Sequence, residues 1–452
     1  MRTKREQVQA QRFIVRRIVS AMISGEPETL DLPMRRVGIA AFAGVLIFAL
    51  VFAGFWVVGL IFPGGAKSWM VDGAIIVEEE TGTRYIYAQG ELHPVQNFAS
   101  ALLIVGNGDR KVHSVHQQSL KGTPRGRTLG IQDAPDALPT KDLFISLPWQ
   151  TCSAPNPVDP TARDSYVLVG APLSPATDLA GQGLVLANGD NFYLVLGATK
   201  YLIDAAALPA LGTDKEQAIR VDDVLVNALR TGPDLVVEIP RKGRAGRDLE
   251  GERYKIGDVF TNNEKFYVLV GDGLASIGEL SAELLGTKKV ELATATVIAN
   301  QSATVIEPAD FPQLRPDVRE GLDGRDTAVC SVFDDQELTI AVHTPVPGNL
   351  SSQTTVAPVG EGDEINTADH VWLPGGYGAL VRAEATPEAP GGTVYLVTDQ
   401  GWKFGLTPEA ITAFGYEKVT PTPIPSGLLA LLPTGPELSQ AAALTPSAGT
   451  GN

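Results

Sequence analysis

The sequence VGIAAFAGVLIFALVFAGFWVVGLIF, from Val37 to Phe62, decides the architecture of this chain. These 26 consecutive residues include no Asp, Glu, Lys, Arg, His, Asn or Gln. A helix rises about 1.5 Å per residue, so the segment would span roughly 39 Å, which exceeds the hydrocarbon core of about 30 Å. The segment therefore predicts one transmembrane helix, which we expect to end at Pro63-Gly64-Gly65.

Two other interpretations of this segment fit less well. The apolar part of a cleaved signal peptide has about 7–15 residues behind a short basic stretch. This apolar run is longer and follows 36 residues. A helix in a soluble core is rarely apolar on every face for about seven turns. We therefore expect insertion in a membrane.

The charges on either side of the apolar segment predict its orientation. Residues 1–36 carry eight Lys/Arg and four Asp/Glu, which leaves 28 basic and 48 acidic residues in the remainder. Because basic flanks stay on the cytoplasmic side, we expect a cytoplasmic N-terminus and a large domain outside the membrane. The acidity of that domain argues against nucleic acid or anionic lipid as its partner.

The basic tail contains a candidate amphipathic helix from about Arg5 to Ile23, surrounded by six basic residues. Its apolar positions on one narrow arc are Val8, Val15, Ile18, Val19 and Met22. Such a helix could lie on the membrane surface or dock on a cytoplasmic partner. The sequence does not choose between these two roles.

Four segments of the exterior part share one pattern: a strand with tyrosine, a glycine turn, a second strand, and a helix. They begin at Arg84–Tyr87, Asn191–Leu196, Lys265–Val270 and Thr393–Val397. In the last three, 19, 19 and 20 residues separate the tyrosine from a closing glycine. The pattern predicts four β-β-α repeat modules, with Thr407 and Pro408 opening the last helix.

The spacing of the repeats predicts how the exterior part is organised. Successive repeat tyrosines are 108, 74 and 128 residues apart, so a regular solenoid is not expected. The predicted organisation is a basic cytoplasmic tail (1–36), a transmembrane helix (37–62), repeat modules (70–106, 181–230, 231–290 and 386–420), a central core in two parts (107–180 and 291–385), and a Pro/Ala-rich tail (421–452). That last tail would be extended or disordered unless it packs back on the core.

The chain has two cysteines, Cys152 and Cys330, one in each part of the predicted core. An even number of cysteines in an oxidising compartment favours one disulfide, and two unrelated buried thiols are the alternative. A disulfide would close a loop of roughly 180 residues and contribute on the order of 5 kcal/mol in the chain-entropy model. The simplest architecture is a core stapled by these cysteines, with repeat modules at its ends.

The sequence shows no catalytic motif. It has no G-x-x-x-x-G-K-[ST] phosphate loop, and Gly64–Ser68 resembles one only superficially. A nucleophile elbow and an H-E-x-x-H zinc motif are also absent from the sequence. The five histidines leave a Ser-His-Asp hydrolase as an alternative, but no pattern supports it. We expect no catalytic, cofactor-binding or metal-binding residues and no enzymatic activity.

Two other groups of polar residues were considered as sites. His113 and His116 are three residues apart, but no further ligand cluster follows them, so a metal site is not expected. The paired carboxylates Asp222-Asp223 and Asp334-Asp335 are interpreted as solvated surface pairs.

Several motifs in order resemble the EccB family, a membrane component of the type VII (ESX) secretion system of actinobacteria. They are LHPVQNFASALL (Leu92–Leu103), GTPRGRTLGIQDAPDALP (Gly122–Pro139), GTVYLVTDQG (Gly392–Gly401) and LPTGPEL (Leu432–Leu438). The N-terminal residues Gln7-Val8, Arg12-Phe13 and Arg16-Arg17 are similar too. The motifs extend over nearly the whole chain.

The resemblance implies an α+β fold class: a single transmembrane helix and a large extracytoplasmic domain with a mostly-β, disulfide-linked central core and four β-β-α repeat modules. It implies that Cys152 and Cys330 are the disulfide partners. It also implies a single-pass protein of the cytoplasmic membrane, with a periplasmic C-terminal domain.

The resemblance also implies partners. These are the motor ATPase, further membrane components and the subtilisin-like mycosin protease of a complex that exports small helical proteins, together with self-association. The family's repeats resemble a cell-wall-binding module of a phage lysin, so an independent peptidoglycan-binding module is an alternative function. The family is sometimes labelled an ATPase or hydrolase, and no nucleotide motif here supports that label.

Overall fold

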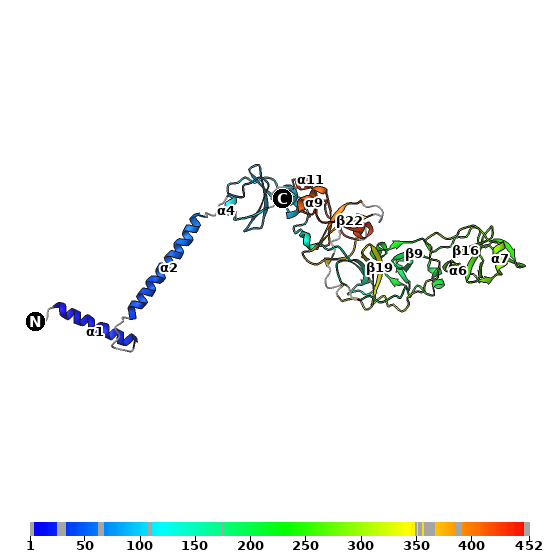
Figure 1. The fold of residues 1–452 in the computed structure, drawn as a ribbon, viewed down its shortest axis with the longest axis horizontal. Helices are drawn as coiled ribbons and strands as arrows, with labels where there is room; N and C mark the ends of the chain where they lie inside the picture. The colour runs from blue at the N-terminus through cyan, green and yellow to red at the C-terminus, as the bar shows by residue number, and fades with distance from the viewer. Residues whose placement is uncertain are drawn as a thin grey trace.

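A computed structural model describes residues 4–24, 33–61, 67–106, 111–172, 175–348, 350, 355–356, 367–384 and 391–446. Two N-terminal helices extend from an elongated series of small sheets (Figure 1). Helix α1 spans Lys4–Ser24, where the sequence predicts a helix, and α2 spans Pro33–Ile61. The predicted helix stop at Pro63-Gly64-Gly65 lies outside the described residues.

Helix α2 contains one segment long and apolar enough to cross a membrane, Val37–Val57, and no part of it is buried inside the protein. Phe42, Phe48 and Phe55 each expose at least 70% of their surface. An apolar helix that the rest of the described chain leaves uncovered needs an apolar surrounding, which a bilayer supplies.

Four sheets share one strand order, in which the first strand lies between the second strand and a parallel closing strand. The first sheet consists of β1 (Ala74–Glu78), β2 (Arg84–Ala88), β3 (Glu91–Val95) and β4 (Val112–Val115). The second consists of β7 (Leu184–Asn188), β8 (Asn191–Leu196), β9 (Thr199–Ile203), β10 (Ile219–Arg220) and an added strand β11 (Arg230–Thr231).

The third sheet consists of β14 (Val259–Asn262), β15 (Lys265–Leu269), β16 (Leu274–Ile277) and β17 (Val290–Glu291). The hairpin of β12 (Ala245–Leu249) and β13 (Glu252–Lys255) precedes it. The fourth consists of β22 (Gly378–Glu384), β23 (Val394–Thr398), β24 (Lys403–Leu406) and β25 (Thr422–Pro425). In each sheet a helix precedes the closing strand: α3 (Phe98–Val105), η2 (Ala205–Leu211), α6 (Glu279–Leu285) and α9 (Pro408–Phe414).

The β-β-α unit predicted from the sequence is therefore too small. Each sheet adds a strand before the predicted pair and a closing strand after the helix. In the first and fourth sheets these added strands include β4, β22 and β25, which lie outside the predicted bounds 70–106 and 386–420. In the second and third sheets they lie within 181–230 and 231–290, except for Thr231 of β11 and Glu291 of β17. The predicted α-helix of the second segment is a 3-10 helix, η2, because Pro209 in its interior has no backbone N–H to donate. Thr407 caps α9 as the sequence predicts: its hydroxyl accepts from Ala410 N.

The central sheet has six strands in the order β19-β18-β5-β6-β21-β20. Its strands are β5 (Trp149–Pro155), β6 (Arg163–Val169), β18 (Ala328–Asp334), β19 (Glu337–His343), β20 (Thr355–Val356) and β21 (His370–Trp372). The two predicted parts of the core thus meet in one sheet, in which β5 pairs with β18 and β6 with β21. The rest of 107–180 and 291–385 includes α4 (Gln117–Leu120), η1 (Lys141–Leu143), α7 (Thr294–Ala299) and all of β22.

The C-terminal segment does not extend away from the described protein. After β25 it forms α10 (Ser426–Ala430) and α11 (Gln440–Ala443). Leu428, Leu429, Leu431 and Leu432 are buried in one cluster with residues of the central and fourth sheets. Burial of these leucines explains why the segment packs back on the core despite its prolines.

Candidate functional site

The disulfide joins neighbouring strands of the central sheet. Cys152 on β5 and Cys330 on β18 are direct cross-strand partners, are fully buried, and form a disulfide as the sequence predicts. The sequence separation of 178 residues places the whole second and third sheets inside the covalent loop. The disulfide therefore fixes the base from which these two sheets extend.

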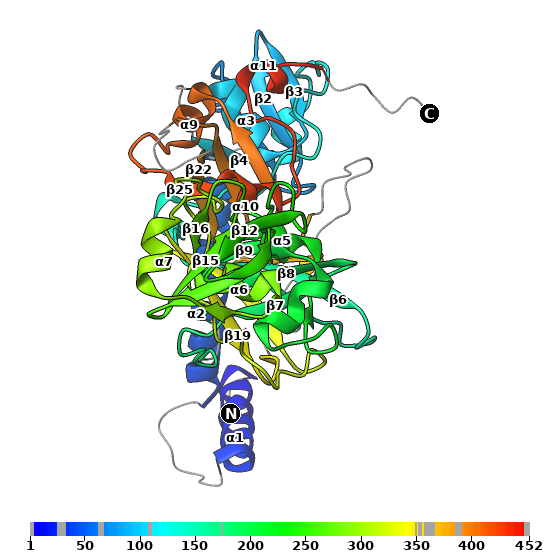
Figure 2. The same cartoon turned by 90° about the vertical axis from the view of Figure 1, so that its right-hand side faces the viewer.

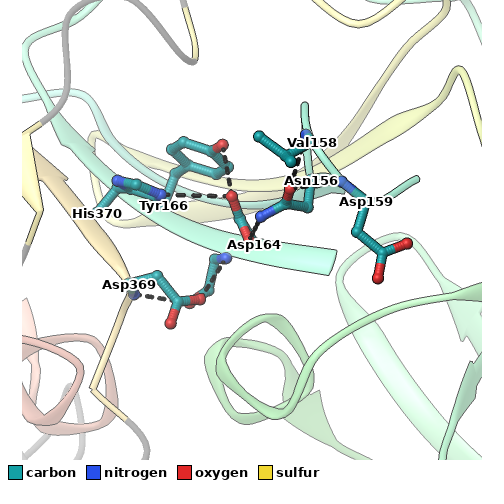
Figure 3. A network of polar contacts seen from close by, with 8 residues as sticks. Asn156, Val158, Asp159, Asp164, Tyr166, Asp369 and His370 are labelled. Atoms are coloured by element: carbon teal, nitrogen blue, oxygen red, sulfur yellow. Dashed lines mark hydrogen bonds and ion pairs between the residues drawn. The ribbon is translucent and has the colours of Figure 1, made fainter. Parts of the chain in front are cut away.

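A polar network joins β6 to β21 next to this disulfide (Figure 3). The Asp164 carboxylate accepts from Asn156 Nδ2 at 2.8 Å and lies 3.4 Å from His370 Nε2. The His370 ring stacks on Tyr166 with 4.7 Å between ring centroids. Burial raises the pKa of Tyr166 to about 12, so its hydroxyl stays protonated and can donate toward Asp164.

A second pair of the same strands lies beside this network. The Ser165 hydroxyl donates to Asp369 Oδ2 at 2.6 Å and accepts from Asp369 N at 2.9 Å. Ser165 thus bonds Asp369, while His370 faces Asp164, so these residues form no Ser-His pair. The arrangement joins two strands that are 204–206 residues apart in sequence, and its role is structural.

Arg163, at the start of β6, makes a third set of contacts that sequence reasoning missed. Its guanidinium donates to the backbone oxygens of Ser153, Gly324 and Thr327 at 2.6, 2.7 and 3.1 Å. Burial lowers the pKa of Arg163 to about 10, so it remains charged at neutral pH. Gly324 and Thr327 are 161 and 164 residues away from Arg163 in the sequence, and no local pattern could indicate these contacts.

One carboxylate pair differs from its sequence interpretation. Asp222 is not a solvated surface residue: its side chain caps α5 (Asp223–Ala228) by accepting from Leu225 N at 2.8 Å. Burial raises its pKa, which nearby hydrogen bonds and Arg163 partly oppose. Asp334 and Asp335 are exposed at the turn between β18 and β19, as expected.

The histidine pair also lies where no ligand cluster surrounds it. His113 belongs to β4, and His116 Nδ1 contacts Glu79 at 3.0 Å and Glu80 at 3.4 Å. In the parts of the chain that the structure describes, no group of three or more His, Cys, Asp or Glu side chains could hold a metal ion.

Two surface hollows lie near the central sheet. One, of about 590 Å³, is lined by Arg163, Phe192, Lys215 and Arg220 among others. The other, of about 310 Å³, is lined by Tyr166 and several prolines. The lining of neither hollow includes a serine, cysteine or histidine, so neither offers a Ser-His or Cys-His pair.

The family comparison agrees with this architecture of one apolar helix and a chain of small sheets. A family model described as "Type VII secretion system ESX-1, transport TM domain B" matches residues 1–450. The chain belongs to the EccB family. The resemblance found in the sequence motifs is thereby confirmed.

Curated EccB proteins align along nearly the full length. "ESX-3 secretion system ATPase EccB3" of Mycolicibacterium smegmatis is 26% identical over 97% of this chain and 90% of its own. "ESX-5 secretion system ATPase EccB5" of Mycobacterium marinum is 27% identical over 97% of this chain and 92% of its own. The word ATPase is part of the names of those relatives.

Solved structures from ESX complexes contain chains of similar fold. A chain of "Structure of an intact ESX-5 inner membrane complex" covers 100% of this chain and 97% of its own, with TM-score 0.62 and 25% identity. A chain of "Structure of EccB3 dimer from the ESX-3 core complex" covers 82% of this chain and 100% of its own, with TM-score 0.61 and 21% identity.

Proposed function

We propose that this chain is a structural membrane component of a type VII secretion machinery, which anchors and organises the channel complex with the motor ATPase. The observation that carries the proposal is the full-length match to a chain of an ESX-5 inner membrane complex. The exposed apolar helix α2 and the absence of a Ser-His pair in the described central network fit that role.

Extraction of the complex tests this proposal. The full-length chain, tagged and produced beside its partner subunits, is extracted in mild detergent and analysed by size-exclusion chromatography and mass spectrometry. We expect a large assembly that includes a motor ATPase. Recovery of the chain as a lone monomer under conditions that keep the other subunits together would contradict it.

We further propose that the chain itself is not an enzyme. Ser165, His370 and the two carboxylates hold β6 against β21, and their hydrogen bonds leave no Ser-His-Asp arrangement in this network. The purified full-length chain should not hydrolyse ATP above background. ATP turnover that stays with the chain through further purification steps would show that the relatives' ATPase label applies to it.

The proposal includes an orientation of the chain across the membrane. We place the N-terminus, including α1, in the cytoplasm and every sheet on the extracytoplasmic side, because residues 1–36 have an excess of basic residues (eight against four acidic) and the remainder has an excess of acidic ones (48 against 28 basic). Protease added to intact spheroplasts should digest the sheets and leave an N-terminal tag protected. Loss of the tag instead would reverse the orientation.

We also propose that the four sheets are internal repeats, each a β-β-β-α-β unit. Their common strand order, parallel closing strand and helix position support this. An experimental structure should superimpose the four units strand for strand. A different strand order in any unit would remove it from the set.

Self-association and contact with a mycosin protease are proposed as further properties of the assembled chain. A solved EccB3 dimer supports the first, and the family resemblance supports the second. Cross-linking in membranes should give chain–chain and chain–protease products. A cell-wall-binding role without a secretion complex is the alternative, and it requires that the chain pellet with peptidoglycan in the absence of all other subunits.

A further inference from the structure

The β12–β13 hairpin is an addition that the other three sheets of the same strand order do not share within the described chain. Residues 241–255 carry six Lys/Arg and three Asp/Glu in an exterior part that is strongly acidic overall. The basic residues are Arg241, Lys242, Arg244, Arg247, Arg253 and Lys255. The hairpin is therefore a basic patch on an acidic molecule.

The charges of this patch are available to a partner. All six basic residues are exposed, and none lies within 4 Å of an acidic group in the described part of the chain to form an ion pair. Glu250 instead accepts from Ala293 N and Thr296 Oγ1, and Glu252 accepts from the Tyr254 hydroxyl. Two of the three acids in the patch thus hold local structure.

The pleat of the hairpin separates its two faces. Leu249 and Tyr254 pack against the third sheet, with Tyr254 edge-on to Phe260 at 4.9 Å. Arg253 and Lys255 alternate with Tyr254 and so point away from it, beside Arg244 in the preceding turn. The outward face carries Asp248 as its one acid.

The patch lies far from the transmembrane helix, so we do not expect the membrane to be its partner. The third sheet and α7, on which the hairpin packs, lie at the end of the molecule opposite α2 (Figure 1). Figure 2 looks along the long axis of the molecule from this end. A partner at this end would meet the basic patch first, while the acidic remainder repels polyanions.

We propose that the outward face of the β12–β13 hairpin binds an anionic cell-wall polymer, through Arg244, Arg253 and Lys255. Guanidinium groups suit phosphate and carboxylate groups because they donate two parallel hydrogen bonds to either. The proposal rests on the extracytoplasmic placement of the sheets given above, and binding to isolated walls tests it independently of topology.

The experiment is co-sedimentation of the full-length chain, in detergent micelles, with purified cell-wall sacculi of the source bacterium. The variant R244E/R253E/K255E is compared with R127E/K141E/K418E, which reverses three exposed charges elsewhere. We expect the hairpin variant to lose roughly tenfold or more in apparent affinity and the control to stay within about twofold of wild type. Binding of the wild type should fall as salt rises, because exposed charges are screened.

Sacculi stripped of covalently attached anionic polymer distinguish the polymer from peptidoglycan itself. We expect the wild type to release from stripped sacculi. The proposal is overturned if the wild type does not bind native sacculi, if both triple variants lose affinity equally, or if stripping has no effect. Normal binding of the hairpin variant, with loss of a co-purifying secretion subunit, would instead assign an acidic protein to this face. Equal melting temperatures of the two variants show that both are folded.

Discussion

The inner half of the protein, made of the first, fourth and central sheets, contrasts with the outer half, made of the second and third. In the inner half the two ends of the exterior chain interlock: the Tyr416 hydroxyl donates to Pro139 O at 2.7 Å, and Leu129 pairs with Pro446. The outer half is one continuous stretch between the two cysteines.

This difference predicts two kinds of stability. Contacts in the inner half join residues far apart in sequence, so each one depends on closing a long loop. The third sheet has its own buried clusters around Val268 and Phe260, built from neighbouring segments. The second sheet shares a buried cluster with Val329 and Val342 of the central sheet. We therefore expect the third sheet to unfold and refold locally, and the inner half and the second sheet to respond together.

The disulfide variant C152S/C330S should give the largest effect. The chain-entropy model assigns about 5 kcal/mol to a loop of this length. We expect the loss to fall on the central sheet, with the third sheet unchanged, in hydrogen exchange of the full-length chain. Equal loss of protection in residues 149–169 and 259–299 would contradict the separation of the two halves.

The second largest effect is expected when a buried phenylalanine is replaced in one half or the other. Phe260→Ala empties a fully buried site in the third sheet and should cost about 3–5 kcal/mol there. Phe333→Ala in the central sheet is the matched variant. We expect limited proteolysis to cut the first variant near the third sheet alone and the second variant throughout the inner half. Identical cleavage patterns would refute this.

A smaller effect is expected where the two chain ends meet. Tyr416→Phe removes one buried hydrogen bond, to Pro139 O, and should lower stability by about 1 kcal/mol. Burial raises the pKa of this tyrosine, so its hydroxyl donates throughout the physiological range. Tyr254→Phe, whose hydroxyl contacts an exposed glutamate, is the control and should leave thermal unfolding unchanged. Equal shifts of the two variants would contradict the account.

The smallest effect is a loss of stability of the inner half as the solution is acidified. Burial lowers the pKa of His343, at the end of β19, below its usual value of 6.5. The unfolded chain then binds more protons just below that pH, so stability is present above about pH 6.5 and lost as the pH falls. In thermal melts at pH 7 and pH 5, His343→Gln should lose less stability than wild type. An equal loss in both proteins would exclude His343 as a source.

Local sequence patterns predicted those elements whose physical cause is itself local. The uninterrupted apolar run gave α2, and Thr407 with Pro408 and Gly415 marked the two ends of α9. The disulfide was predicted from the even number of cysteines and from the oxidising compartment expected for the exterior domain. Each of these inferences uses residues close in sequence or a property of the whole chain.

The sequence did not predict elements whose formation depends on residues far away in the chain. The closing strands β10 and β17 are two residues long and have no periodicity of their own. Asp164 and His370 are 206 residues apart, and Arg163 reaches carbonyls about 160 residues away. The sequence predicts a tail at the proline-rich C-terminus, because the apolar cluster that buries its leucines is formed by residues distant in sequence.

The structural role is tested most directly by asking whether the secretion complex needs this chain. Membranes from cells with and without it are extracted in mild detergent, and the motor ATPase is followed by size-exclusion chromatography. We predict that the ATPase leaves the large-assembly fraction when the chain is missing and returns when the full-length chain is resupplied. An assembly of unchanged size and composition without the chain would contradict its role as a structural membrane component.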